Sequence, residues 1–542
     1  MRSWTTDIIG TRFSENLYYN SGTLNGATPR YNGNIAAMQW SVANDNLNYK
    51  RAYSFTYDDL NRLTNANYYG FSNGSVISGT TDKYNETLDY QNDKMGNIHG
   101  ITRNENGTQV ESLGLQYLGN QLQKVDNGIY HYINYGSELF KDYDNHTPLS
   151  AEYAYDTNGN MLYDANGGVS AIQYNLLNLP DKIHFTAGHK NLYTYDAGGR
   201  KLRIVNYSSN RVLDIPMNTI TALSSTPSDY IVLTTDYVGN IIYENGALKE
   251  ILLPDGYYKD GVFYYYLKDH LGNNRVTINS SGTVVEKNHY YPSGTRFFSE
   301  STSNSSALAY RYNGKEMEAM NGLNQMDYGA RRRFSWAPIW TCLDPLAEKY
   351  YSISPYVYCA GNPVIFIDPD GRDLRYAHGS TQAFKRDVVN TIRYMNRKGT
   401  SGNIKEIMNN REKTVYIKKT SGGTNFDANT NTLYWNPEMG IVTTNGFKLS
   451  PATALGHDAD HAQQWLKNPE QYKLDAKQES SSYERKEEER VVTGSEQDTA
   501  KKHGEIQEGE TTRQDHKAVE EFKTISPTTT EIKPIEKKED KK

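Results

Sequence analysis

Cysteine and long apolar runs are scarce in this sequence of 542 residues. It contains only 2 Cys, Cys342 and Cys359, which argues against a disulfide framework or a cysteine-rich zinc site and favours two unpaired core residues. No apolar run approaches the roughly 20 residues that a spanning helix needs, so we expect no membrane-spanning segment. Residues 1–7 lack an apolar signal-peptide core, which means either that the chain leaves the cell by another route or that its N-terminus is missing. We expect secretion, or delivery to a target cell, without a signal peptide, with display on the cell surface as an alternative.

Charge of one sign is scarce as well. The chain carries 58 Lys and Arg against 64 Asp and Glu, a formal net charge of −6. A balance this close to neutral provides no basic footprint for nucleic acid and no polybasic attraction to a membrane surface. We therefore expect no nucleic-acid partner.

Tyrosine and glycine, in contrast, are abundant, with 45 Tyr against 14 Phe and 6 Trp, and 43 Gly. Tyrosine favours pleated surfaces, where its ring packs and its hydroxyl is hydrogen-bonded, and glycine marks tight turns. The composition predicts a mainly β protein with many hairpins and argues against a mainly helical one.

A short motif recurs before residue 203. It begins with two aromatic residues at alternate positions, continues with Asp-x-x-Gly or a close variant, and ends in a second apolar stretch. Copies lie at residues 55–63, 88–98, 153–162, 172–179 and 193–202. Each copy predicts a strand, an Asx-type turn and a return strand. A lone hairpin is marginal in water, so the units must stack side by side, which predicts a wrapped β-solenoid.

These units resemble the YD repeats of bacterial Rhs proteins, and later motifs resemble the Rhs-repeat-associated core. The core-like motifs lie at residues 264–273, 310–316, 327–331, 344–350 and 362–371. The resemblance implies a YD/RHS repeat region at 1–259 and a repeat-associated core at 260–373. It also implies a β-sheet shell that encloses the polypeptide following the core.

The end of the core-like region carries a Pro-x-x-x-x-Asp-Pro-x-Gly motif at residues 363–371. In the resembling proteins this motif marks a self-cleavage point, and the resemblance implies that Asp344 and Asp368 are the aspartates that cut there. Paired carboxylates can activate water against a peptide bond, which makes the chemistry reasonable. The simpler alternative is that two Asp-Pro turns only close the shell. Arg372 stands where the family usually has Leu.

Residues 450–466 have the pattern of a helix. Ser450 can cap it, Pro451 suits its first turn, and Asn468-Pro469 ends it. His457 and His461 are four residues apart, so both imidazoles project from one face and can share a metal ion. The alternative is a helix with two solvated or hydrogen-bonded histidines.

The context favours a zinc ion. In the peptidase motif His-Glu-x-x-His the Glu is the general base, and here Asp458 stands in that position as the candidate catalytic residue. Glu488, on a following helix, is the predicted third ligand, with Glu487 as the alternative ligand. Residues 431–437 predict a strand that could hold a substrate backbone.

These residues resemble the zinc metallopeptidase domains found as Rhs cargo and among translocated effector proteases. The resemblance implies a small α+β zincin-like toxin domain at 374–506, followed by a charged tail at 507–542 whose composition predicts disorder. The first hypothesis is a polymorphic toxin whose zinc endopeptidase cuts proteins of a target cell, with a cognate immunity protein. The alternative is a non-enzymatic YD-repeat surface protein with a degenerate C-terminal domain. A nuclease cargo is a third, weaker option, because acidic residues surround the histidines.

Overall fold

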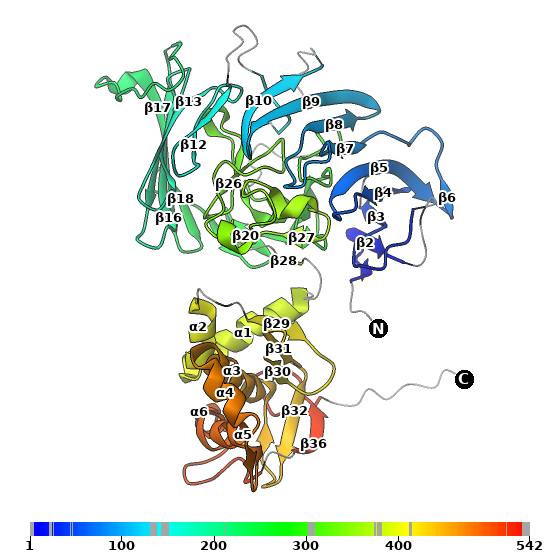
Figure 1. Cartoon of the computed structure of the whole chain (residues 1–542), viewed down its shortest axis with the longest axis vertical. Coiled ribbons are helices and arrows are strands. Elements are labelled where there is room, and N and C mark those ends of the chain that lie inside the picture. The colour runs from blue at the N-terminus through cyan, green and yellow to red at the C-terminus, as the bar shows by residue number, and fades with distance from the viewer. Residues whose placement is uncertain are drawn as a thin grey trace. The chain divides into compact units, whose positions relative to one another are not determined.

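The computed structural model describes residues 5–533 except 21–23, 25–26, 44, 46, 130–137, 143–150, 212, 302–308, 373–374, 377–381, 411–412, 414 and 516–517. The chain divides into two compact units, Met1–His378 and Gly379–Lys542 (Figure 1). In this described part of the chain, no helix is long and apolar enough to cross a membrane.

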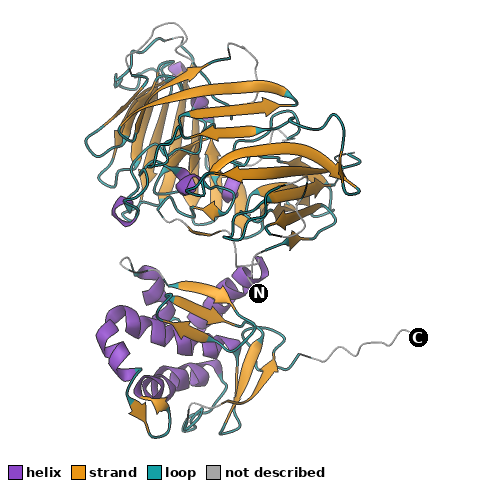
Figure 2. Cartoon of the chain, turned by 45° about the vertical axis from the view of Figure 1, so that its right-hand side comes forward, coloured by secondary structure: helices purple, strands orange, loops and turns teal. Residues whose placement is uncertain are grey.

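Antiparallel strands dominate the first unit (Figure 2). In spatial order, the first sheet contains β1 (Asp7–Ile8), β2 (Phe13–Tyr18), β3 (Ala37–Val42), β4 (Lys50–Tyr57), β5 (Leu63–Ser72), β7 (Glu86–Asp89), β8 (Gly100–Glu105), β9 (Thr108–Leu118) and β10 (Gln121–Asn127), with β6 (Ser75–Val76) paired to β5. The second sheet contains β11 (Tyr153–Tyr155), β12 (Met161–Asp164), β13 (Val169–Tyr174), β14 (Pro180–Phe185), β15 (Lys190–Tyr195), β16 (Lys201–Ser209), β17 (Tyr230–Val238), β18 (Ile241–Glu244), β19 (Ala247–Leu253), β20 (Gly256–Lys259), β21 (Val262–Lys268), β22 (Asn274–Asn279) and β23 (Val284–Lys287).

Short elements complete this unit. They are the strands β24 (Glu316–Glu318), β25 (Gln325–Asp327), β26 (Arg332–Phe334), β27 (Phe366–Ile367) and β28 (Arg375–Tyr376), and the 3-10 turns η1 (Pro227–Asp229), η2 (Tyr312–Gly314), η3 (Met320–Gly322), η4 (Ala347–Lys349) and η5 (Tyr358–Gly361). Apart from β6, strands that are neighbours in sequence are neighbours in the two large sheets. The pairing confirms the predicted mainly β class. The two large sheets are antiparallel meanders, and the wrapped solenoid stays a prediction.

The Tyr-Asp motif forms one recurrent turn. At each turn the Oδ1 atom of an Asp or Asn accepts hydrogen bonds of 2.8–3.1 Å from the backbone N–H groups two and four residues later. These acceptors are Asp58, Asp156, Asn175, Asp196, Asp269 and Asn279. The residue three positions after each acceptor is Gly or Asn with a φ of 56–83°, the left-handed region that these two residues adopt most easily. Hydrogen bonds and backbone preferences within five residues are therefore sufficient to form this turn.

The tyrosine before the turn makes a hydrogen bond that Phe could not make. Its ring packs against neighbouring strands, and its hydroxyl donates to a backbone carbonyl in the preceding unit. The bonds run from Tyr57 to Ile35, from Tyr174 to Met161 and from Tyr195 to Pro180, at 2.7, 2.7 and 3.0 Å. A phenylalanine would leave each partly buried carbonyl without this bond, at a cost of about 1–3 kcal/mol.

The segment after the second sheet fills the space between the two sheets (Figure 1). Side chains of this segment, from Tyr291 and Phe297 to Val364 and Ile365, belong to the same apolar cluster as those of both sheets. The rings of Tyr84 and Phe297 stack with centroids 4.1 Å apart, and the indole N–H of Trp40 donates to Nδ1 of His289 at 3.2 Å. Each aromatic ring buried in this way contributes about 1.5–3 kcal/mol. The core of the first unit is thus packed with the unit's own residues.

His270 lies at a buried junction of three segments. Its Nδ1 is 3.0 Å from a carboxylate oxygen of Glu15 on β2, and its Nε2 is 2.9 Å from the backbone carbonyl oxygen of Val364. Burial alone would lower the pKa of His270, but the charges of Glu15 and Asp269 raise it to about 9. Both ring nitrogens face acceptors, so the protonated imidazolium is the form that makes both bonds.

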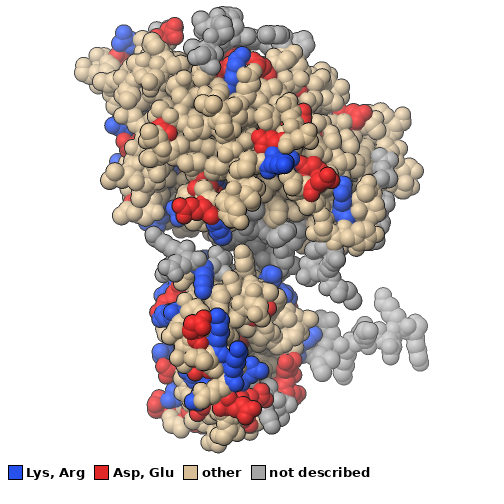
Figure 3. All heavy atoms as spheres, viewed as in Figure 1, with Lys and Arg blue, Asp and Glu red and all other residues tan. Residues whose placement is uncertain are grey.

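The second unit is α+β. Its elements are α1 (Gln382–Lys398), α2 (Gly402–Asn409), β29 (Tyr416–Lys419), β30 (Asn425–Asp427), β31 (Thr432–Trp435), β32 (Met439–Thr443), β33 (Lys448–Leu449), α3 (Pro451–Lys467), α4 (Pro469–Asp475), β34 (Glu479–Ser480), β35 (Glu484–Arg485), α5 (Lys486–Val491), the π-helical turn η6 (Val492–Glu496), α6 (Gln497–His503) and β36 (Ala518–Lys523). A mixed sheet has the order β29-β31-β30, and a separate antiparallel sheet has the order β33-β32-β36. Trp435, Leu455 and Met395 lie in its apolar core. On the face shown in Figure 3, acidic and basic side chains lie side by side over this unit.

Part of the predicted disordered tail is ordered, so the prediction is wrong there. β36 pairs antiparallel with β32, with Met439 opposite Lys523, and Phe522 is buried. Composition predicted disorder because the segment has few apolar residues. Its backbone pairs with a strand far away in sequence, and composition contains no information about such pairing. Residues 534–542 of the predicted tail lie outside the described residues.

We expect His270→Gln to remove a pH-dependent contribution to the stability of the first unit. The folded pKa of about 9 lies above the ordinary 6.5, so the stabilisation is fully present below pH 6.5 and is lost as the pH rises through 9. A shift of this size corresponds to about 3 kcal/mol. Urea unfolding at pH 6 and pH 9.5 should show the wild-type chain losing more stability than the variant. The partly exposed His99→Gln serves as the control, and an unchanged pH profile in His270→Gln contradicts the assignment.

Candidate metal centre

Helix α3 carries both histidines of the candidate site and begins where the sequence predicted. The side chain of Ser450 accepts a hydrogen bond from the Thr453 N–H, and Pro451 occupies the first turn. His457 and His461 lie one turn apart and are 6% and 5% exposed. Their Nε2 atoms are 3.2 Å apart, so the two rings point at the same place.

Helix α5 brings the third predicted ligand to that place. The two carboxylate oxygens of Glu488 lie 3.3 Å from Nε2 of His457 and 3.4 Å from Nε2 of His461. One possible ligand atom from each of the three residues falls within a span of 4.8 Å. Two imidazoles and one carboxylate, with a coordination position left for water or substrate, are the donor set of many catalytic zinc sites. The residues therefore fit the ion that the sequence implied.

The π-helical turn η6 explains a contact that sequence reasoning missed. Glu496 is 1% exposed, and its Oε2 lies 2.8 Å from Nδ1 of His457. On a regular helix Glu488 and Glu496 would point about 80° apart, because eight residues turn through about 800°. One extra residue in the π turn reduces this angle to about 20°, so both carboxylates face α3. A π turn has no periodicity that a sequence reveals.

A carboxylate also lies behind the second imidazole. Glu487, the alternative ligand, has its Oε1 3.0 Å from Nδ1 of His461, on the ring edge opposite the one that faces Glu488. A carboxylate that accepts the Nδ1–H bond sets the tautomer and directs the other nitrogen towards a metal. In this geometry Glu487 is placed to orient His461, and Glu488 faces the Nε2 atoms of both histidines.

The two aspartates of α3 have different surroundings. Asp460 accepts a hydrogen bond from Asn403 at 3.1 Å and pairs with Arg490, so it ties α2 and α5 to α3. Asp458, the candidate base, is 7% exposed and follows His457 directly.

Negative charge dominates the candidate site. Burial alone would lower the pKa of His457, but hydrogen bonds to Glu488 and Glu496 raise it to about 10. Burial, together with the charges of nearby carboxylates that include Asp458, raises the pKa of Tyr472 on α4 to about 12. Such surroundings favour a cation, whether a proton or a metal ion.

The predicted substrate strand at 431–437 is not an edge strand. β31 occupies the middle of its sheet, with β29 parallel on one side and β30 antiparallel on the other. Both of its backbone edges are therefore paired, which excludes the predicted role in holding substrate. The prediction failed because a single strand pattern does not reveal its neighbours. Among the described residues, β30 lies at the edge of this sheet.

The junction aspartates of the first unit meet at one arginine. Nη2 of Arg331 lies 2.9 Å from both Asp344 and Asp368. Its Nε donates to the backbone carbonyl of Gly371 at 2.6 Å, and Oδ1 of Asp368 accepts from the N–H of Arg372 at 3.1 Å. Both ends of the 371–372 peptide bond are therefore held by these side chains. Burial raises the pKa of both aspartates. The sequence offered no sign of the role of Arg331.

A second cluster of carboxylates holds an amine. Glu316, Glu318 and Asp327 also lie close enough to share a metal ion. Nζ of Lys201 is 2.8, 2.5 and 2.6 Å from these three side chains. The lysine already supplies the positive charge, so we do not regard this cluster as a metal site.

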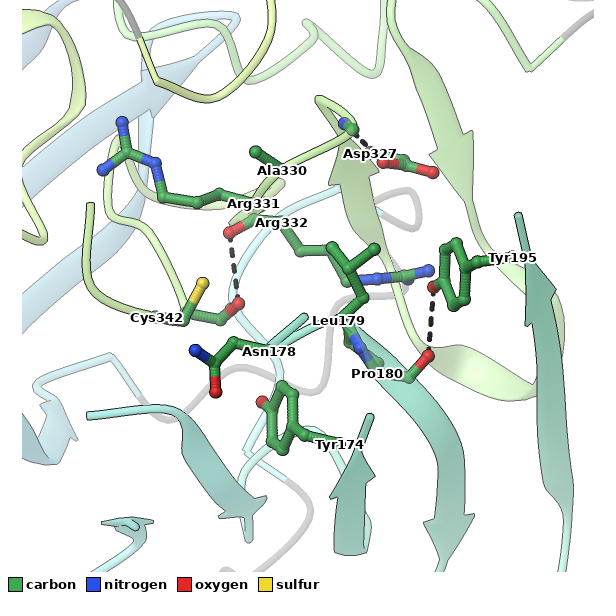
Figure 4. Close-up of a pocket in the computed structure, with 12 residues that line it drawn as sticks. Tyr174, Asn178, Leu179, Pro180, Tyr195, Asp327, Ala330, Arg331, Arg332 and Cys342 are labelled. Carbon is green, nitrogen blue, oxygen red and sulfur yellow. Dashed lines mark hydrogen bonds between the residues drawn. The ribbon is translucent and has the colours of Figure 1, made fainter. Parts of the chain in front are cut away.

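A small cavity lies next to Arg331 (Figure 4). Its lining includes Tyr174, Tyr195 and Cys342, and its volume of about 10 Å³ leaves room for about one water molecule. Cys342 and Cys359 are both unpaired and buried, as predicted. Burial raises the pKa of Cys342 to about 11, so its thiol is protonated at neutral pH.

We expect substitutions of three consecutive glutamates to separate ligand from orienting residue. Glu488→Gln should abolish tight zinc binding by the full chain. Glu487→Gln should keep one zinc ion per chain and weaken its affinity about 10–100-fold, as is typical when an orienting partner is lost. The exposed Glu489→Gln is the matched control and should bind as the wild type does. Chelator competition measures the zinc affinity of all three variants. If Glu488→Gln binds zinc tightly and Glu487→Gln does not, then Glu487 is the ligand and Glu488 the orienting residue.

The chain matches no known protein-family model. It is similar to salivary gland surface protein 1 of Aedes aegypti, with 33% identity over 117 residues, which is 22% of this chain and 3% of that protein. Among solved structures it is similar to chains of the TcdB2-TccC3-Cdc42 and TcdB2-TccC3 structures and of a Photorhabdus luminescens Tc holotoxin pore. Their identities are 15%, 16% and 16%, their TM-scores 0.32, 0.32 and 0.31, and the matches cover 66%, 66% and 69% of this chain. The chain spans only 20–21% of those chains, and the likeness is too distant to support a functional argument.

Proposed function

We propose that the chain is a toxin or effector in which an Rhs-type β unit precedes a zinc-dependent endopeptidase. The observation that carries the enzymatic part is the convergence of His457, His461 and Glu488, with an orienting carboxylate behind each imidazole. The toxin class rests on the YD-repeat and core motifs of residues 1–373, which resemble those of Rhs proteins.

Zinc held by these three residues would polarise a peptide carbonyl and lower the pKa of a water molecule towards about 7. Glu487 and Glu496 orient the two imidazoles. Asp458 is the proposed general base: its carboxylate takes a proton from the attacking water and later gives it to the leaving amine. Its place directly after the first histidine ligand supports this role.

Among the strands that the structure describes, β30 lies at an edge of its sheet, and this position supports an extended polypeptide as the substrate. Phe426 of β30 packs against Trp465 of α3 and Tyr472 of α4, with ring centroids 5.9 and 6.2 Å apart, so the strand lies close to the helix that carries the histidines. An edge strand offers backbone N–H and C=O groups to another extended chain. We propose proteins of a target cell as substrates, reached by secretion or delivery, and an immunity protein that protects the producing cell.

One observation favours a second candidate function. Asp458 is one methylene shorter than the Glu of the peptidase motif, and a misplacement near 1 Å can cost about 100-fold in rate. A chain that binds zinc without hydrolysis would be a YD-repeat surface protein with a degenerate C-terminal domain.

The full chain should bind one zinc ion and cleave a denatured protein substrate, and a chelator should stop the cleavage. Asp458→Asn should retain the zinc and lose at least about 100-fold in hydrolysis rate, because the base is gone. Asp458→Glu restores the usual reach and should cleave at least as fast as the wild type. Metal analysis and the appearance of new peptide ends measure both properties.

Glu489→Gln is the control for this experiment, because its side chain is exposed and adjoins the site residues only in sequence. A wild-type chain without stoichiometric zinc contradicts the enzymatic proposal. Zinc binding without hydrolysis in both the wild type and Asp458→Glu supports the degenerate domain instead.

We also propose that the first unit cuts the chain after Gly371. Water adds to the Gly371 carbonyl carbon, one of Asp344 and Asp368 takes its proton, the other protonates the amine of Arg372, and the C–N bond breaks. Arg331, which donates to the Gly371 carbonyl oxygen, would stabilise the negative charge that develops there.

Mass spectrometry of the purified chain should show two fragments that meet between residues 371 and 372. Asp344→Asn should leave the chain intact, because one member of the carboxylate pair can no longer exchange a proton. Asp370→Asn is the neighbouring control and should be cut as the wild type is. An uncut wild-type chain would favour the simpler reading, in which Asp368 only shapes the turn through its bonds to the backbone N–H groups of residues 370–372.

A further inference from the structure

A segment near the C-terminus lies directly behind the candidate metal centre. Thr512 and Arg513 are 0% and 5% exposed, and both contact Glu496, the carboxylate that orients His457. The hydroxyl of Thr512 donates to Oε1 of Glu496 at 2.8 Å, and Nε of Arg513 donates to the same oxygen at 3.0 Å. Nη2 of Arg513 pairs with the other oxygen, so the guanidinium grips the carboxylate with two bonds.

The same segment is attached to the hairpin that precedes α3. The side chain of Asn445 donates to the carbonyl of Thr511 at 3.1 Å, and the hydroxyl of Thr444 donates to Asp515 at 3.2 Å. Beyond these residues, β36 pairs with β32 of the same hairpin. Contacts on both sides of Arg513 therefore fix its position relative to the helix that carries the histidines.

Glu496 needs this partner. It is 1% exposed, and a buried carboxylate without a matching cation is destabilised by several kcal/mol. A Glu496 side chain that moved or became neutral would no longer hold the Nδ1–H group of His457 in place. The imidazole could then turn, and its Nε2 atom would lose the direction that it shares with His461 and Glu488.

His461 is supported in a similar way, by a carboxylate and an arginine, but this arginine is more exposed to solvent than Arg513. Arg490 grips Glu487 through two bonds of 2.7 and 3.0 Å, and Glu487 faces His461. The Arg490 side chain is 34% exposed, whereas that of Arg513 is 6% exposed. Water can replace part of the interaction between Arg490 and Glu487 but little of that between Arg513 and Glu496. We therefore expect the loss of Arg513 to weaken metal binding more than the loss of Arg490.

We propose that Arg513, assisted by Thr512, is a positioning residue of the metal centre, and that residues 511–515 belong to the site instead of to a tail. Arg513 holds Glu496, Glu496 orients His457, and His457 presents its Nε2 to the metal. This inference rests on the proposed function, because it assumes that the centre binds a metal ion.

The test measures the zinc affinity of the full chain by chelator competition and the absorption spectrum of the cobalt-substituted chain. Arg513→Met should weaken zinc binding about 10–100-fold and change the cobalt spectrum, since losses of orienting partners typically have this size. Arg513→Lys keeps the charge without the two-bond grip and should fall between Arg513→Met and the wild type. Lys523→Met removes an exposed cation of β36 on the same segment and should leave both readouts unchanged.

A double variant distinguishes a specific path from general loosening. If Arg513 acts through Glu496, then Glu496→Gln combined with Arg513→Met should bind zinc no more weakly than the worse single variant. Additive losses would overturn the proposed path. A folded Arg513→Met chain with wild-type affinity and spectrum would overturn the inference outright.

Two further outcomes keep the proposals separate. A wild-type chain that binds no zinc refutes the proposed function. Equal zinc affinities of the wild-type chain and Arg513→Met refute only the positioning role. If Arg513→Met fails to fold, Thr512→Val decides, because it removes one hydrogen bond to Glu496 and keeps the shape of the side chain. Thr512→Val should weaken zinc binding several-fold, and an unchanged affinity would overturn the inference.

Discussion

Buried carboxylates that require a matching cation organise both units of this protein. In the first unit, Arg103 pairs with Glu86 and Glu111, and none of the three side chains is more than 2% exposed. Lys201 holds three further carboxylates together, and Arg331 joins the two aspartates of the junction. An unmatched charge at any of these places would cost several kcal/mol, so each pair determines which segments can lie side by side.

The candidate metal centre follows the same constraint in two layers. The outer layer matches Glu487 with Arg490 and Glu496 with Arg513, and these carboxylates then orient the two histidines. The inner layer directs Glu488 at both imidazoles. At the Lys201 cluster the protein supplies the cation from its own chain. The inner layer instead has the two nitrogens and the carboxylate that suit a zinc ion.

Much of the local structure was predictable from the sequence. The Asp-x-x-Gly motif predicted the recurrent turn because its hydrogen bonds lie within five residues, and the capping pattern of Ser450 and Pro451 predicted the start of α3. The spacing of His457 and His461 placed both on one helix face. Glu496, Arg331 and Arg513 were missed, because each acts through a contact made by distant segments or, for Glu496, through a π turn without a periodic signature.

By itself, the sequence determined the mainly β class, the turns, helix α3 and a set of possible ligands. These follow from propensities, hydrogen bonds and spacings that act over a few residues. Only the tertiary structure decided that β31 is a central strand, that residues 507–533 contain β36, and which carboxylate faces which imidazole nitrogen. Those outcomes depend on strand pairing and charge matching between distant segments, and no local pattern encodes the partner of a strand or of a buried charge.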